Sequence, residues 1–297
     1  MIITKTPYRI SFFGGGSDYP SWYLKNGGSV LSTTIDKYIY ISCRYLPPFF
    51  EHKYRIVWSH IENVKDIKNI KHRSVKELLK YFKIKKGLEI HYDGDLPSRS
   101  GMGSSSVFVV GLMNLLNNFN GKTISKKQLA IKSINFEQNI LNDTVGSQDQ
   151  IAATYGGFNK ISFRTNGSFI VEPVSIKKNI IYNLNKNLVL LYTGYKRTAP
   201  DIAKTYVNKL EKSKRDNILE ISSYVDEALN ALKKNDLISF GRLLHESWIL
   251  KKNLSDSITN NKINEIYNEA LKKGALGGKL LGAGGGGFFL FYVPYSR

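Results

Sequence analysis

The sequence contains a single cysteine, Cys43, which excludes an internal disulfide and any zinc cluster built on cysteines. Its five histidines are scattered and do not show the spacing of metal ligands. The longest apolar run, Phe288 to Val293, is too short to cross a bilayer. The first residues, Met1 to Pro7, lack the apolar segment of a signal peptide. We therefore expect a soluble, cytoplasmic protein without a membrane partner.

Acidic residues are also few, since 24 Asp and Glu stand against 43 Lys and Arg and give a formal net charge of +19. A basic balance is typical of proteins with anionic partners, such as nucleic acid, acidic lipid or a phosphorylated small molecule. The lysines are spread along the chain, however, so a solvated Lys-rich surface also explains the charge. The 297 residues, 42% of them hydrophobic, suffice for one large domain or two lobes.

Strand patterns dominate the first half of the chain and helical patterns the second, with a composition shift near Asn187. We predict strands at Thr4–Phe13, Ser29–Arg44, Tyr54–Trp58, Leu88–Tyr92, Leu188–Thr193 and Phe288–Val293, and a hairpin at Phe158–Val174 that turns at Asn166-Gly167. We predict helices at Arg73–Ile84, Ser104–Asn118 and Lys126–Leu141, and a mostly helical stretch at Pro200–Lys273. This order favours an α+β protein in two lobes, 1–187 and 188–297, over a doubly wound sheet.

The segment from Pro97 to Ser106 carries the strongest chemical signal. Gly101 and Gly103 let the backbone bend tightly, and the serines stand where a helix begins. Free backbone N–H groups and the helix dipole at such a point favour a phosphate, and a hydroxyl there can bind Mg²⁺. An ordinary Gly/Ser helix cap is the alternative. No Gly-x₄-Gly-Lys-Ser/Thr pattern occurs, which excludes a Walker-type nucleotide loop.

A second constellation joins Arg9 to the turn from Gly14 to Asp18. A strand that ends in three glycines presents Asp18 near the tip of a loop. A carboxylate in that position suits sugar hydroxyls, although a turn-capping aspartate has the same local pattern.

Two further segments have a functional and a structural interpretation. Asp149 lies in a polar cluster, Val145 to Gln150, where it can serve phosphoryl transfer as a carboxylate near the attacking hydroxyl or simply cap a helix. The run from Gly282 to Gly287 contains too many glycines for a regular helix or strand. It permits either a close backbone approach to a ligand or flexibility.

Taken together, these segments resemble the GHMP kinase superfamily, which includes galactokinase, homoserine kinase, mevalonate kinase and phosphomevalonate kinase. Pro97–Ser106 is similar to its second motif, with Met102 in place of Leu and Ser106 in place of Ala. Arg9–Tyr19 resembles the first motif in its galactokinase-like form, and Lys279–Phe289 resembles the Gly-rich third motif. The order and wide separation of the three motifs make a chance agreement improbable.

Within the superfamily, the resemblance is greatest to the branch that phosphorylates D-glycero-D-manno-heptose 7-phosphate. The segments that carry it are Arg9–Pro20, Val145–Gln150, Leu244–Trp248 and Gly274–Phe289. The resemblance implies ATP-dependent phosphorylation of the anomeric C1 hydroxyl to the 1,7-bisphosphate, a step toward nucleotide-activated heptose. A fucokinase- or galactokinase-like sugar kinase remains an alternative.

The resemblance also implies a fold, with a ribosomal-protein-like first lobe that binds the nucleotide and a helical, ferredoxin-like second lobe. Family members usually continue through a further helix and strand after the Gly-rich motif. We therefore expect a second lobe that lacks these two elements, because this sequence ends at Arg297.

Residue roles follow from the same match. Asp149 is expected to be the catalytic base, with Arg9 as the cation that pairs with it and offsets charge on the attacking oxygen. Ser105 and Glu137 are expected to bind Mg²⁺, although this chain has one extra residue between Glu137 and Asp149. The expected nucleotide-binding residues are Pro97, Arg99, Gly101, Met102, Gly103, Ser104, Ser105 and Ser106. The expected substrate-binding residues are Gly15, Gly16, Ser17, Asp18, Arg197, Lys279, Gly284 and Gly285.

The phosphate of a heptose 7-phosphate needs cations at the far end of the site. The candidates are Arg55, Arg99, Lys196, Arg197 and Lys279. Arg197 comes first, because Thr193–Thr198 is basic and turn-like and follows a predicted strand. A stripe of His245, Trp248 and Lys252 shares one helix face and either lines the cleft or belongs to the core.

A basic nucleic-acid-binding protein without catalytic activity is the alternative from a different class. Such a protein needs clustered basic residues with exposed aromatic side chains. The densest basic cluster here, Lys65–Lys86, is separate in sequence from the Gly-rich motifs. A binder also has no need of Asp149, Arg9 and Ser105 in register, so we expect a small-molecule sugar phosphate partner and no specific nucleic acid. The oligomeric state is left open.

Overall fold

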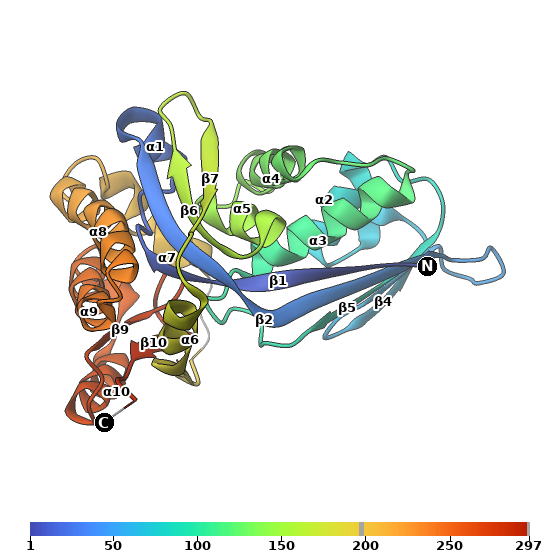
Figure 1. Cartoon of the computed structure of the whole chain (residues 1–297). Helices are drawn as coiled ribbons and strands as arrows, with labels where there is room; N and C mark the ends of the chain where they lie inside the picture. The colour runs from blue at the N-terminus through green and yellow to red at the C-terminus, as the bar shows by residue number, and fades with distance from the viewer. Residues whose placement is uncertain (196–198, 296–297) are drawn as a thin grey trace.

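The first half of the chain folds around one long strand. The computed structural model describes residues 1–195 and 199–295. Strand β2 (Gly28–Tyr45) lies at the centre of a seven-stranded sheet, and β1 (Ile2–Phe13) runs antiparallel along one of its edges. The other edge of β2 is shared, because β6 (Phe158–Phe163) pairs with its first part and β5 (Leu88–Gly94) with its last part. Both long strands therefore extend from one end of the sheet to the other (Figure 1).

Three short strands complete this sheet. They are β3 (Tyr54–Val57), β4 (Ile61–Val64) and β7 (Phe169–Pro173), which gives the order β4-β3-β5-β2-β6-β7 with β1 paired to β2. Only β3 and β5 pair in parallel. Because of this parallel pair, the chain leaves β3 and β5 at the same end of the sheet, and the segment after β5 leads to the predicted phosphate loop.

Four helices cover one face of the sheet (Figure 1). They are α2 (Arg73–Tyr81), α3 (Ser104–Phe119), α4 (Lys126–Asn135) and α5 (Gln148–Tyr155). The apolar helix α3 packs on β1 and β2, where Gly111 allows a close approach, since a Cβ there would lie 2.7 Å from Thr6 Oγ1. A one-turn π-helix, Phe136–Ile140, follows α4 directly.

The second half combines helices with a three-stranded antiparallel sheet. The sheet has the order β8-β10-β9, from β8 (Leu188–Tyr192), β9 (Gly277–Leu280) and β10 (Phe288–Tyr292). The helices are α6 (Lys178–Lys186), α7 (Ala199–Lys204), α8 (Arg215–Lys233), α9 (Leu237–Lys252) and α10 (Asn261–Lys272), while α1 (Pro20–Asn26) belongs to the first half. Short 3₁₀ turns lie at Ile67–Asn69, Val207–Lys209 and Asp256–Ile258.

The two halves share a hydrophobic core rather than meeting through a linker. The ring of Phe240 in α9 makes edge-on contacts with Phe12 (5.5 Å between centroids) and Phe13 (5.2 Å) at the end of β1. Helix α9 also packs against β9. The end of β1 is therefore fixed between the two halves, and this placement determines where the first motif lies.

The structure confirms the α+β fold, and the predicted strands and hairpin are present within a few residues. The predicted helix Lys126–Leu141 is wrong in its last turn, which is π-helical. The sequence analysis did not identify α1, β4, α5, α6 or β9, which are short or interrupted by glycine. The boundary at 187/188 stays a prediction, although all three strands of the second sheet follow it. Among the described residues, no helix is both long and apolar enough to span a membrane.

Candidate functional site

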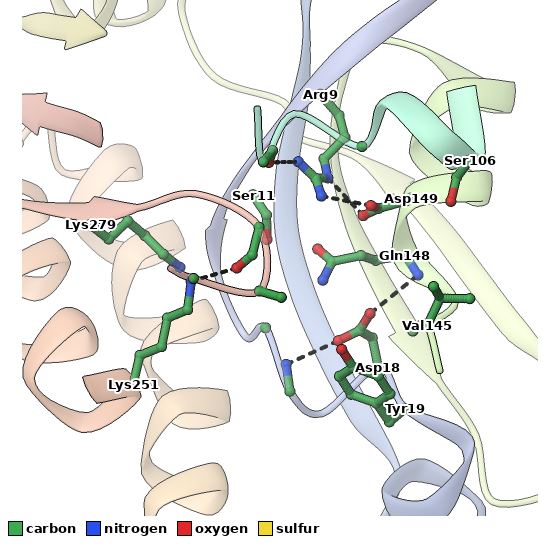
Figure 2. Close-up of a pocket in the computed structure, with 18 of the residues that line it drawn as sticks. Arg9, Ser11, Asp18, Tyr19, Ser106, Val145, Gln148, Asp149, Lys251 and Lys279 are labelled. Atoms are coloured by element: carbon green, nitrogen blue, oxygen red, sulfur yellow. Dashed lines mark hydrogen bonds and ion pairs between the residues drawn. The ribbon is translucent and has the colours of Figure 1, made fainter. Parts of the chain in front are cut away.

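A cavity of about 300 Å³ lies where the end of β1, the starts of α3 and α5, the end of α9 and the Gly-rich turn before β10 meet (Figure 2). Its wall therefore draws on both halves of the chain. The predicted site residues that line it are Arg9, Gly15, Gly16, Asp18, Arg99, Gly101, Gly103, Ser104, Ser105, Ser106, Asp149, Lys279 and Gly284. The fold thus brings the three separate motif segments to one cavity.

The loop before α3 has the backbone that a phosphate site needs. Gly101 (φ 80°) and Gly103 (φ 77°) adopt left-handed conformations that favour glycine. A Cβ at Gly101 would lie 2.5 Å from the carbonyl oxygen of Leu281, so glycine also lets this loop pack against the Gly-rich turn. The buried Met102 anchors the loop in the core. Helix α3 begins at the cavity wall, where its first backbone N–H groups are free for phosphate oxygens.

Asp149 is held by a two-pronged ion pair. Arg9 Nε donates to Asp149 Oδ1 (2.7 Å) and Arg9 Nη2 donates to Oδ2 (2.6 Å). The remaining guanidinium nitrogen, Nη1, donates to the carbonyl oxygen of Gly101 (2.7 Å), which ties the pair to the phosphate loop (Figure 2). Arg9 is buried, whereas the Asp149 side chain is 22% exposed. Since Ser147 precedes α5, Asp149 is not its N-cap.

Asp18 is a second carboxylate on the opposite side of the cavity from the phosphate loop (Figure 2). Its Oδ1 accepts from the backbone N–H of Gly16 (3.0 Å), and its Oδ2 accepts from that of Gln148 (3.4 Å). Burial, and then the charge of Asp149, raise the pKa of the Asp18 carboxyl. The neighbouring Gly146 leaves room for this carboxylate, because a Cβ there would lie 1.9 Å from Asp18 Oδ2.

Ser105 lines the cavity, and Glu137, which is not a lining residue, lies buried behind it. Ser105 Oγ donates to Glu137 Oε1 (3.2 Å), and Gln150 Nε2 donates to Glu137 Oε2 (2.5 Å). Glu137 is fully buried, and burial raises its pKa to about 7. The π-helical turn that contains Glu137 takes up more residues than an α-turn does, so it offers a place for the extra residue before Asp149.

Two lysines reach the cavity from the second half of the chain. Lys279 in β9 is buried, and its Nζ donates to the carbonyl oxygen of Phe12 (2.8 Å). Lys251 near the end of α9 is partly buried, and its Nζ donates to the carbonyl oxygens of Leu280 (2.7 Å) and Gly282 (2.5 Å). Burial lowers the pKa of Lys279 to about 7, and burial also holds the pKa of Lys251 well below its usual value.

Some predicted residues do not line the cavity. Pro97, Met102, Ser17 and Gly285 contribute to the backbone around it; Ser17 Oγ, for example, donates to the Gly14 carbonyl oxygen (2.8 Å) and stabilises the turn. Arg55 on β3, one of the candidate cations, lies 3.7 Å from Glu89 and does not line the cavity. Lys196 and Arg197 fall outside the described residues, and their assignment stays a prediction.

The stripe of His245, Trp248 and Lys252 does not line the cavity either. Trp248 is fully buried against Phe289, and the imidazole of His245 hydrogen-bonds the Tyr267 hydroxyl (2.8 Å). The cavity is lined instead by the neighbouring face of α9, through Ser247 and Lys251, which the sequence analysis missed together with Ser11, Tyr19 and Tyr206. The four-residue spacing of Ser247 and Lys251 was a usable signal, because it places them one helical turn apart.

Known proteins with similar sequences match over the whole chain. The model of the GHMP kinases N terminal domain matches residues 69–157, and that of the GHMP kinases C terminal domain matches residues 228–294. A D-glycero-alpha-D-manno-heptose 7-phosphate kinase from Campylobacter jejuni is 31% identical over 100% of this chain and 90% of that protein. An L-fucokinase/L-fucose-1-P guanylyltransferase from Bacteroides fragilis is 27% identical over 96% of this chain but only 34% of that protein.

Solved structures agree on the fold. A D-glycero-D-manno-heptose 1-phosphate kinase from Bacteroides thetaiotaomicron superposes with a TM-score of 0.79 at 24% identity, over 100% of this chain and 90% of that one. A Lactococcus lactis galactokinase complexed with galactose reaches a TM-score of 0.74 at 19% identity, over 99% of this chain and 86% of that one. The motif segments, the cavity they form and the full-length match to a sugar-phosphate kinase place this chain in the GHMP kinase family, as a sugar kinase.

Proposed function

We propose that this kinase transfers the γ-phosphoryl group of ATP to the anomeric C1 hydroxyl of D-glycero-D-manno-heptose 7-phosphate and releases the 1,7-bisphosphate and ADP. The observation that carries the proposal is the Arg9–Asp149 ion pair, which is bonded to the phosphate loop on one side and faces the Asp18 carboxylate across one cavity. The 31% identical heptose 7-phosphate kinase supports the choice of substrate.

Each group has a step in this reaction. The C1 oxygen attacks the γ-phosphorus, the bond from that phosphorus to the β–γ bridging oxygen breaks, and the hydroxyl proton passes to the Asp149 carboxylate. Arg9 fixes both oxygens of this carboxylate, so its free lone pairs keep one direction relative to the loop. Asp18 accepts hydrogen bonds from sugar hydroxyls and holds C1 toward Asp149.

Ser105 on the cavity wall and Glu137 buried behind it are the oxygen pair that would hold magnesium. Mg²⁺ prefers oxygen ligands and usually keeps waters and phosphate oxygens in its shell, so two protein oxygens suffice. Within the described part of the chain, no three His, Cys, Asp or Glu side chains come together as a metal site of their own. The ion would neutralise charge on the nucleotide phosphates, while Ser105 and Glu137 hold it at the start of α3.

The half-buried rings of Trp58, His72 and Tyr92, which lie around the buried Phe108, offer a place for the nucleoside of ATP. Phe108 follows Ser104 by one turn of α3, and its ring contacts His72 (4.8 Å between centroids) and Tyr92 (5.2 Å). The ring of Trp58, which follows β3, contacts the same His72 (5.0 Å). Aromatic faces stack on nucleobases without dependence on their hydrogen-bonding edges.

The test is an acceptor panel with ATP and Mg²⁺. We expect kcat/KM for D-glycero-D-manno-heptose 7-phosphate to exceed that for the free heptose, fucose and galactose by about 10²–10⁴, the effect of two charge-assisted hydrogen bonds to a phosphate. Equal values for phosphorylated and free sugars would reject the heptose phosphate. A preference for fucose or galactose would favour a fucokinase- or galactokinase-like enzyme.

A further inference from the structure

One wall of the cavity carries four donors that the protein leaves without an anion. Lys251 and Lys279 are its ammonium groups, and neither has an ion-pair partner among the residues that the structure describes. The hydroxyls of Ser11 and Ser247 are buried in the same wall and have no hydrogen-bond partner within residues 1–195 and 199–295. A buried donor without a partner is costly, so a set of them indicates a ligand that completes the site.

The four side chains lie close together although they come from three elements. Ser247 and Lys251 lie one turn apart on α9. Lys251 Nζ donates a hydrogen bond to the carbonyl oxygen of Leu280, the residue that follows Lys279. Lys279 Nζ donates a hydrogen bond to the carbonyl oxygen of Phe12, the residue that follows Ser11. Figure 2 shows the two lysine ends converging beside Ser11, and the charges of Lys279 and Arg9 add to burial in lowering the pKa of Lys251.

We propose that Lys251, Lys279, Ser11 and Ser247 form the site that binds the phosphoryl group already present on the acceptor. The inference rests on the proposed function and adds to it the residues that choose a phosphorylated sugar over a free one. Phosphate oxygens accept from ammonium and hydroxyl groups alike, and a dianion supplies the counter-charge that the two lysines lack.

The position of this cluster favours the acceptor's phosphate over those of ATP. The nucleotide phosphates have the loop from Gly101 to Ser106 and the start of α3. Ser11 stands two residues beyond Arg9 on the same face of β1, roughly 7 Å along the strand. The cluster is therefore set back from the Arg9–Asp149 pair, which leaves room for a sugar between the reacting hydroxyl and the far phosphate.

The decisive measurement is kcat/KM for heptose 7-phosphate and for the free heptose in wild type and variants. We expect Lys251→Met to lower kcat/KM for the phosphorylated sugar by about 10- to 100-fold more than kcat/KM for the free sugar. Ser247→Ala should lower the same ratio by about three- to tenfold. Lys252→Met is the matched control on the same helix, outside the cavity, and should keep the wild-type ratio.

Three outcomes would overturn the inference. Equal losses for both sugars in Lys251→Met would mean that Lys251 only supports the Gly-rich turn through Leu280 and Gly282. A raised KM for ATP would assign the cluster to the nucleotide. An unchanged ratio in both Lys251→Met and Ser247→Ala would move the phosphate elsewhere while leaving the proposed function intact. If Lys251→Met does not fold, Ser247→Ala decides alone, because it removes no hydrogen bond.

Inorganic phosphate separates this inference from the proposed function. At saturating ATP, phosphate should inhibit the wild type competitively against the sugar phosphate, and Lys251→Met should weaken that inhibition about tenfold or more. If the wild type shows no preference for heptose 7-phosphate but phosphate binding still depends on Lys251, the substrate assignment fails and the anion site stands. Phosphate inhibition that is identical in both proteins would overturn the site.

Discussion

At the scale of single residues, the site depends on positions where a carboxylate and the backbone opposite it fit each other closely. The Asp18 carboxylate accepts hydrogen bonds from two backbone N–H groups, and its Oδ2 occupies the space that any side chain at position 146 would need. Asp149 is fixed in the same way by the two prongs of Arg9. Such contacts fix the direction of each charge, which matters more for catalysis than its mere presence.

Gly146→Ala should displace the Asp18 carboxylate without touching the phosphate loop. We expect kcat/KM for the sugar to fall by about tenfold or more, since a misplaced group costs catalysis strongly, while KM for ATP stays nearly unchanged. Gly121→Ala, where no atom lies within 4 Å of an added Cβ but φ is 68°, is the control for backbone strain at a glycine outside the site. Wild-type kinetics in Gly146→Ala would show that Asp18 does not hold the sugar.

Asp149→Asn should keep the fold and remove most of the turnover. A positioned base contributes about 10²–10⁴-fold, and the amide also loses one of the two hydrogen bonds from Arg9. The readout is kcat at saturating ATP and sugar, with the exposed Asp226→Asn as the control for a lost surface charge. A kcat close to that of the wild type would mean that Asp149 is not the base.

The pH dependence of kcat/KM for the phosphorylated sugar should report the protonation state of Lys279. Its pKa is lowered to about 7 by burial and by Arg9, while Asp18 acts in the opposite direction. Only the ammonium form attracts a phosphate, so kcat/KM for the phosphorylated sugar should fall as pH rises above 7, by up to about tenfold per unit. The free sugar should lack this limb, and Lys279→Met should weaken it and leave the part that comes from Lys251, whose pKa is also lowered. A profile that is identical for both sugars would contradict a role for Lys279 in phosphate binding.

At the scale of elements, the sequence predicts which residues share a helix face better than which face meets the cavity. Periodicity placed His245, Trp248 and Lys252 on one side of α9, but the large indole prefers the core, where Phe289 and Tyr267 surround it. The cavity therefore receives the adjacent face with Ser247 and Lys251. Helix packing decides this rotation, and packing depends on residues far away in sequence.

The same limit applies to the short elements of the site. The motif segments predicted the phosphate loop and the position of Asp149. This was possible because glycines and serines at the start of a helix favour particular local conformations. The Arg9–Asp149 pair joins residues 140 positions apart, so only the family resemblance indicated it. No periodic pattern in the sequence marks the π-turn at Phe136–Ile140, yet this turn carries the Glu137 carboxylate that meets Ser105.

Ser105→Ala and Glu137→Gln should each raise the Mg²⁺ concentration that gives the half-maximal rate. Each change removes an oxygen ligand from a hard cation that has few protein contacts. The measurement is a Mg²⁺ titration at fixed ATP, with the exposed Glu269→Gln as the control. Unchanged titration curves in both variants would place the ion away from this pair.

At the scale of the whole molecule, the net charge of +19 coexists with a cavity that needs cations for two phosphorylated ligands. Several lysines pair with acidic groups on the surface, as Lys160 does with Asp226 (2.5 Å).

The family and the fold were accessible from the sequence because three motifs keep their order along the chain. The sequence did not predict that the end of β1 packs against the second half, because the Phe12–Phe240 contact joins residues from both halves of the chain.

Nucleic acid should bind only weakly and non-specifically. A basic surface gives retention that falls steeply with salt, because it depends on the release of counterions. Fluorescence anisotropy with labelled RNA and DNA between about 50 and 200 mM salt should show this slope without sequence preference. Submicromolar binding at about 150 mM salt, together with an absence of kinase activity, would favour the nucleic-acid-binding alternative.

The central claim is that this fold aims the C1 hydroxyl of a heptose 7-phosphate at ATP through Asp149, Arg9 and Asp18. The most direct test is ³¹P and ¹H NMR of the product formed from ATP, Mg²⁺ and D-glycero-D-manno-heptose 7-phosphate. The account predicts a new phosphate coupled to the anomeric proton, with the 7-phosphate retained, and no such product from Asp149→Asn. A phosphate on any other hydroxyl, or no transfer to this sugar at all, would contradict it.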